Sequence, residues 1–103
     1  MKIQFNTDKS ISGDERNETF FTTLISEELD RFQSHITRVE VHLSDENGRK
    51  EGGNDKQCLL EARLEGRKPI AVTNQAATIE KAVSGAVSKL KSSLDSMLNQ
   101  GHR

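Results

Sequence analysis

The side chains best suited to chemistry in this sequence are its cations, which are unevenly distributed along the chain. Residues 1–55 contain seven Lys and Arg against twelve Asp and Glu, whereas residues 56–103 contain eight against four. Such asymmetry can mark a basic face for an acidic partner. It is equally typical of an ordinary dipole across a small domain. With a net charge of −1, the chain lacks the strongly basic footprint of a dedicated nucleic-acid binder.

Residues that would support catalysis or metal binding are scarce. The three histidines, His35, His42 and His102, are far apart and have no ligand spacing. The acidic segment 45–55 lacks the regular ligands and the bidentate Glu of a calcium loop. No nucleophile arrangement, glycine-rich phosphate loop or zinc signature occurs, and without Trp or Tyr no platform for base stacking is indicated. We therefore expect a protein with no catalytic residues, no metal site and no cofactor.

Four serines at strict four-residue spacing form a second unusual feature: Ser84, Ser88, Ser92 and Ser96. Serine has only an intermediate helix propensity. Four serines aligned on one helix face therefore suggest that a partner molecule approaches this face closely. A partner backbone or a second helix would fit. The alternative is a face that is merely polar.

Length and composition indicate one domain covering residues 1–103, with a core that is mainly aliphatic. The aromatic residues expected to complete this core are Phe5, Phe20, Phe21 and Phe32. No stretch approaches the roughly 18 apolar residues of a membrane span, and the N-terminus lacks the apolar run of a signal peptide. Since the single cysteine, Cys58, cannot form an internal disulfide, we expect a cytoplasmic protein and a buried thiol.

Hydrophobic periodicity predicts the elements of the first half. Met1, Ile3 and Phe5 alternate with polar residues, which indicates a strand buried on one face. A capping box at Ser12 and Glu15 precedes a helix predicted over about 13–34. The apolar stripe of this helix recurs every three or four residues: Phe21, Leu24, Ile25, Leu29, Phe32 and Ile36.

The second half is predicted to contain three strands and a helix. Alternation indicates strands over 37–44 and 58–64 and a short strand at 70–72, separated by a solvated, mobile loop at 45–55 and a turn at 66–69. The last helix is predicted to begin near 74–77 and to end near Asn99, with Gly101 as its cap.

Alternating strands imply a sheet covered on one face only, and two helices with one apolar stripe each can cover it. The predicted fold is α+β: a β-α-β-β-β-α two-layer sandwich with a four-stranded mixed sheet and two helices on one face. For the hairpin between 37–44 and 58–64, opposite charges across the strands favour a register in which facing residue numbers sum to 103. Arg38 would then face Glu65, and Glu40 would face Arg63.

The sequence of these elements resembles a known family. The segments that carry the resemblance are HITRVEVHLSDEN (35–47), CLLEARLEG (58–66), PIAV (69–72) and QAATIEKAVSGAVSKLKSSL (75–94). They are similar to the ribosome hibernation-promoting factor and ribosome-associated inhibitor A family, also called ribosomal subunit interface proteins. The resemblance covers essentially the whole chain and fits a divergent short form. Where members usually carry Lys or Arg on both helices, this chain has Glu27, Glu28 and Asp95, while Arg31 and Lys89 fit the pattern.

The resemblance implies docking on the 30S ribosomal subunit, where the protein would contact 16S rRNA at the subunit interface and inhibit translation by occupancy. It implies a monomer or weak dimer with no small-molecule substrate and no membrane. Because Lys and Arg provide most of the affinity for phosphates, the predicted RNA-binding residues are Arg63, Arg67, Lys68, Lys81, Lys89 and Lys91. The alternative for each is a solvated charge whose stem covers an apolar edge.

Two other readings remain. The chain could be a protein–protein interaction module that kept the fold and lost most RNA affinity, using the serine-lined helix or the open face of the sheet. It could also be an ordinary double-stranded RNA binder. That fold places a lysine cluster at the start of its last helix, where this chain has only Lys81.

Overall fold

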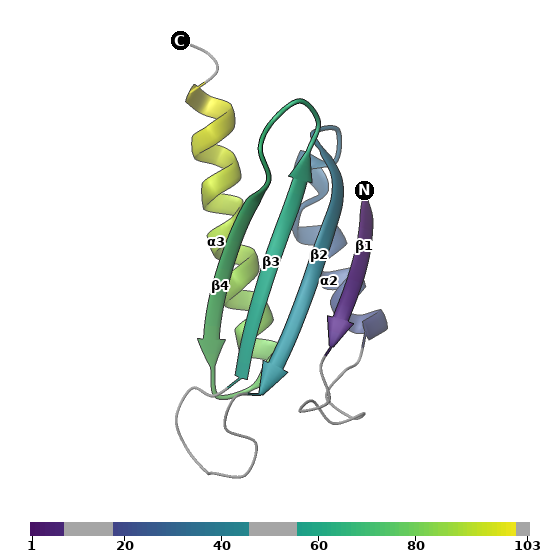
Figure 1. The fold of residues 1–103 in the computed structure, drawn as a ribbon, viewed down its shortest axis with the longest axis vertical. Helices are drawn as coiled ribbons and strands as arrows, with labels where there is room; N and C mark the ends of the chain where they lie inside the picture. Colours follow the sequence, from purple (N-terminus) through teal and green to yellow (C-terminus); the bar gives the residue numbers. More distant parts are fainter. Residues whose placement is uncertain (8–17, 46–55, 101–103) are drawn as a thin grey trace.

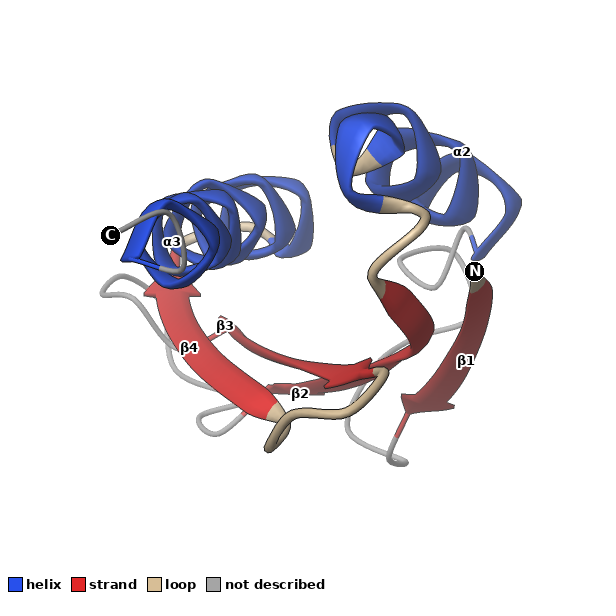
Figure 2. Cartoon of the chain, turned by 90° about the horizontal axis from the view of Figure 1, so that it is seen from above, coloured by secondary structure: helices blue, strands red, loops and turns tan. Residues whose placement is uncertain are grey.

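The computed structural model describes residues 1–7, 18–45 and 56–100. In these residues a four-stranded sheet, in the order β1-β2-β3-β4, carries both helices on one face (Figures 1 and 2). The elements are β1 (Lys2–Thr7), α2 (Glu18–Glu28), the short 3-10 helix η1 (Asp30–Phe32), β2 (Ile36–Asp45), β3 (Lys56–Leu64), β4 (Ile70–Ala76) and α3 (Ile79–Gln100). The predicted β-α-β-β-β-α two-layer sandwich is confirmed. No helix in the described ranges is long and apolar enough to cross a membrane.

Strand pairing follows from the connections between the strands. β1 lies parallel to β2, as the crossover through α2 requires, whereas β2–β3 and β3–β4 are antiparallel. Along β2 and β3 every second side chain is buried, so each strand has an apolar and a polar face. We call the face that carries no helix the open face.

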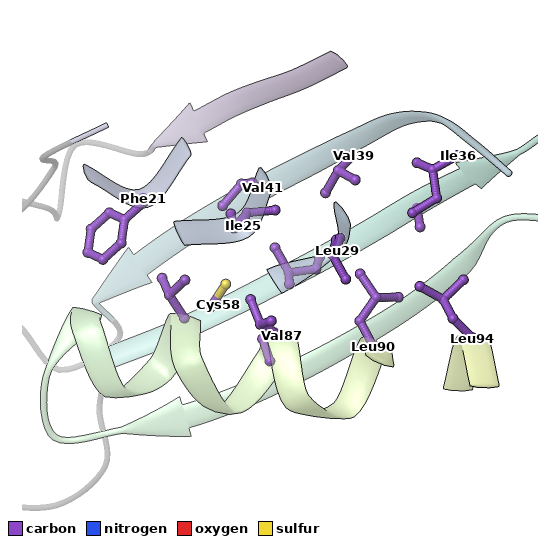
Figure 3. Packing of buried hydrophobic residues seen from close by; sticks show 14 of the residues in the cluster. Phe21, Ile25, Leu29, Ile36, Val39, Val41, Cys58, Val87, Leu90 and Leu94 are labelled. Carbon is purple, nitrogen blue, oxygen red and sulfur yellow. The ribbon is translucent and has the colours of Figure 1, made fainter. Parts of the chain in front are cut away.

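The core lies between the sheet and the two helices (Figure 3). Val39 and Val41 of β2, Leu60 of β3, and Leu90 and Leu94 of α3 are fully buried, and α3 packs over β3 and β4. From α2 and η1, the buried side chains are Phe21, Ile25, Leu29 and Phe32. One of the four phenylalanines departs from the predicted core: Phe20 is 45% exposed, with its ring edge-to-face on Phe21. Phe5 is partly buried and packs against the core.

The first helix ends earlier than the predicted range of 13–34. It ends at Glu28, and after Leu29 the chain continues in η1. Ile36, which the sequence pattern placed on the helix, begins β2 instead. Ile36 follows Phe32 by four residues and is equally buried. This strand residue therefore continued the helical spacing of apolar residues, and the pattern assigned it to the helix. The Ser12–Glu15 capping box and the start of the helix lie outside the described residues, as does the 46–55 part of the predicted loop.

The last helix begins later than the predicted 74–77, because β4 continues to Ala76. Thr78 caps α3: its hydroxyl accepts a hydrogen bond from the Lys81 N–H at 3.1 Å. The apolar stripe expected on the last helix is present: Ile79, Val83, Ala86, Leu90 and Leu94 are buried, and Met97 is partly buried. In the turn between β3 and β4, Gly66 adopts φ 75°, which favours glycine. Gly101 lies outside the described residues.

The predicted register of the β2–β3 hairpin is wrong. Facing residue numbers sum to 101, so Arg38 faces Arg63 and Glu40 faces Glu61. The charges are compensated along and diagonally across the strands instead. Glu40 binds Arg38 at 2.7 Å and Arg63 at 3.9 Å. The observed register also pairs Asp45 with Lys56, whose charged groups lie 2.7 Å apart.

The Asn74 side chain links β4 to α3 next to Gly85. Its side-chain amide lies 3.3 Å from the carbonyl oxygens of both Lys81 and Ala82. A Cβ atom on Gly85 would lie 2.1 Å from the Asn74 Nδ2 atom, so this contact requires the absence of a side chain at residue 85.

We expect Gly85→Ala to destabilise the protein by about 1–3 kcal/mol, because the new methyl group overlaps Asn74. In an Asn74→Ala background the same change should stabilise by up to about 1 kcal/mol, the helix-propensity difference between alanine and glycine. Urea unfolding of the two single variants and the double variant measures this. Additive effects would show that Gly85 is not required by Asn74.

Cys58 is fully buried, and burial raises the pKa of its thiol to about 12. Since only the thiolate reacts, we expect negligible modification by a thiol reagent in native buffer at pH 8, and rapid modification in denaturant. Rapid labelling of the native protein would contradict this burial.

Candidate nucleic-acid interface

The six predicted RNA-binding residues do not form one surface. Arg63 lies on the open face near the end of β3, and Arg67 and Lys68 are exposed in the turn that follows. Lys81, Lys89 and Lys91 lie on α3, which covers the opposite face of the sheet (Figure 2). We call the end of the sheet with the β3–β4 turn the turn end.

Two of the three α3 lysines are engaged within the chain. The Lys89 ammonium donates to the backbone carbonyl of Thr73 in β4 at 2.8 Å. The Lys91 ammonium binds the carboxylate of Glu28 in α2 at 2.9 Å. Lys81 is exposed and forms no ion pair with the described residues. Of the α3 cations, only Lys81 is therefore available to an anion without breaking an existing contact.

A second ion pair joins the helices. Arg31 of η1 binds Asp95 of α3 through two hydrogen bonds of 2.8 Å, and its guanidinium lies 4.3 Å from the centre of the Phe32 ring. The hydrogen bond with Asp95 raises the pKa of Arg31, and the same contact lowers the pKa of Asp95. Sequence patterns gave no sign of this pair, because its members are 64 residues apart.

The outer layer of helices has more acidic than basic groups. Over 18–32 and 79–98 it carries six carboxylates against four cations. The carboxylates are those of Glu18, Glu27, Glu28, Asp30, Glu80 and Asp95. The cations are Arg31, Lys81, Lys89 and Lys91. This layer offers an anionic partner little net attraction.

The open face carries a row of cations at its turn end. Lys2 of β1 pairs with Arg38 of β2, which in turn pairs with Arg63 of β3. Sequence reasoning placed the side chains of Arg38 and Arg63 on the outer face of their strands but did not align them with Lys2, because alignment depends on the register. The next row contains Gln4, Glu40 and Glu61.

The described surface also has hollows. One, of about 310 Å³, lies at the far end of the open face and is lined by Asn6, His42, Leu43, Ser44, Gln57 and Leu59. Another, of about 200 Å³, lies between α2 and α3 and is lined by Leu24, Glu28, Ser84, Val87 and Ser88. Ser84, Ser88, Ser92 and Ser96 are all exposed, as predicted.

Within the described residues, no group of three or more His, Cys, Asp or Glu side chains could hold a metal ion. The fold and the exposed charged side chains together are those of a small α+β binding domain. The chain belongs to the family described as sigma 54 modulation protein / S30EA ribosomal protein, which its residues 6–99 match. The resemblance to hibernation factors seen in the sequence is thereby confirmed.

Solved structures share the fold. The N-terminal domain of Thermus thermophilus Protein Y superimposes with a TM-score of 0.73 at 18% identity, covering 94% of this chain and 99% of that one. A ribosomal subunit interface protein from Coxiella burnetii gives a TM-score of 0.69 at 17% identity, covering 96% and 99%. No curated protein matches the sequence significantly.

The Arg31–Asp95 pair makes stability depend on pH in a definite direction. A carboxylate with a lowered pKa contributes stability above its unfolded pKa of about 3.9 and loses it as the pH falls through its folded pKa. We expect Asp95→Asn to lower the melting temperature at pH 7, and the difference from the wild type to disappear as the pH falls through the lowered folded pKa of Asp95. Glu27→Gln, which removes a carboxylate that is unpaired in the described structure, is the control. A difference that persists in acid would exclude this ion pair as its source.

Proposed function

We propose that this protein binds the 30S ribosomal subunit, contacts 16S rRNA at the subunit interface and inhibits translation by occupying that site. The observation that carries the proposal is family membership over residues 6–99. It is supported by a fold shared with a solved ribosomal subunit interface protein. Such a function would place the protein in the cytoplasm, as a monomer or weak dimer.

Occupancy requires affinity and shape but no bond making. We propose that the affinity comes from phosphate contacts by exposed cations, among them Arg63, Arg67 and Lys68. Each phosphate contact releases condensed counterions, so binding should weaken as salt increases. With so few available cations, about three to five phosphates would be neutralised.

A protein partner is the second candidate function. The observation that favours it is the excess of carboxylates on the helix layer, next to the hollow lined by Ser84 and Ser88. Small side chains there allow a partner backbone to approach closely. In this case binding to ribosomes would be weak or absent.

Sedimentation with purified 30S subunits tests the proposal. We expect the protein to move with the 30S fraction at low salt. The logarithm of the affinity should fall with the logarithm of salt with a slope of about −2 to −4, using roughly 0.7–0.9 per phosphate contact. Failure to sediment with 30S at 50 mM salt would reject this function, and a salt-independent affinity would reject the phosphate contacts.

A further inference from the structure

We infer that the turn end of the open face is the surface that binds RNA, and that it takes the phosphate backbone of a strand. Its members are Lys2, Arg38 and Arg63, which form the cation row, together with Arg67 and Lys68 of the adjoining turn. The inference rests on the proposed function and names the surface through which it acts. It assigns a role to Lys2 and Arg38 and removes the α3 lysines from the contact.

The register brings the cation row together. Lys2, Arg38 and Arg63 are Cα partners across three neighbouring strands, which are about 4.8 Å apart. The Cα atoms of the three basic residues therefore lie within about 10 Å of one another on one face. Figure 1 shows that the start of β1, the start of β2 and the end of β3 lie at the same end of the sheet as the β3–β4 turn. Arg67 and Lys68 extend the row at that end.

The carboxylates near the row hold the arginines without hiding them. Glu40 contacts both Arg38 and Arg63, yet only 15% of its side chain is exposed, against 37% for Arg38 and 46% for Arg63. The anionic group thus lies deeper than the guanidinium groups. Because the two arginine side chains are already held in place, less conformational entropy is lost when a phosphate binds to them.

Charge distinguishes the two faces of the molecule. The turn end has five cations against the three carboxylates Glu40, Glu61 and Glu65. The helix layer has the opposite balance, and three of its four cations are engaged: Arg31 with Asp95, Lys91 with Glu28, and Lys89 with the Thr73 carbonyl. At the turn end two of the five cations, Arg38 and Arg63, have carboxylate partners among the described residues. An approaching polyanion is therefore attracted to the sheet and repelled by the helices.

The character of the surface favours a nucleic-acid backbone over a protein. Protein interfaces depend on buried aromatic and large apolar anchors. The described open face has no phenylalanine side chain, and its one large apolar residue, Leu59, lies with His42 in the hollow at the far end. At the turn end the neighbouring row consists of Gln4, Glu40, Glu61 and Ala71. Contacts there are almost entirely ionic, as phosphate binding requires.

Two matched triple variants test the assignment. Lys2→Gln/Arg67→Gln/Lys68→Gln removes three positive charges from the turn end, and Lys81→Gln/Lys89→Gln/Lys91→Gln removes three from α3. Arg38 and Arg63 are left unchanged to preserve the Glu40 contacts. Each variant is measured against 30S subunits in a salt series and against a single-stranded oligouridine at 50 mM salt, with its melting temperature as a check on folding.

We expect the turn-end variant to lose about a hundredfold in affinity for 30S at 0.1 M salt and to lower the magnitude of the salt slope by about 2, since each lost contact removes about 0.8. The α3 variant should lose less than about threefold. Glu65→Gln, which removes an exposed carboxylate beside Arg67, should increase affinity.

The outcomes separate the two claims. If wild type binds 30S but the turn-end variant binds equally well, the surface assignment is overturned while the function stands. If wild type does not bind 30S, the function fails, and the oligouridine series still decides the surface: unchanged or absent binding there overturns it. Loss of 30S binding with unchanged oligouridine binding would replace RNA by a ribosomal protein as the partner.

Discussion

The alternation of side chains along β2 and β3 is the constraint on which the rest of the structure depends. Burying Val39, Val41 and Leu60 under the helices forces Arg38, Glu40 and Arg63 onto the opposite face. A shift of one residue would put charges into the core. The sheet therefore fixes the apolar layer and the charged layer together, and the candidate interface follows directly from the hydrophobic packing behind it.

The charged layer shows how like charges can face one another in a stable sheet. Arg38 opposite Arg63 and Glu40 opposite Glu61 would be unfavourable as isolated pairs. Each arginine nevertheless has a carboxylate nearby: Arg38 and Arg63 share Glu40, and Arg63 also lies 3.7 Å from Glu61. This alternating pattern places cations of neighbouring strands side by side, where a register with opposite charges facing would have dispersed them.

Most of the fold was predictable from local patterns, whereas the site depended on contacts between distant segments. Hydrophobic periodicity gave the element order, the buried thiol of Cys58 and the stripe on α3. Periodicity failed where one buried residue fitted both the helical and the strand spacing, as Ile36 did after the first helix. The predicted register of the β2–β3 hairpin was wrong because only charge pairs directly across the strands were considered, and diagonal pairs were left out. The Arg31–Asp95 and Lys91–Glu28 pairs join segments more than 60 residues apart, and no local pattern carries that information.

The hydrogen bond from Lys89 to the Thr73 carbonyl also affects how molecules of this protein meet one another. β4 is an edge strand of the described sheet, and an exposed edge invites pairing with a strand of another molecule. An ammonium group held over that edge obstructs such pairing, because a strand added there would have to displace it and leave its charge desolvated. Pro69, which precedes β4 and has no N–H, reinforces the effect. A lysine that the sequence suggested for ligand binding therefore occupies a carbonyl group of the edge strand in this structure.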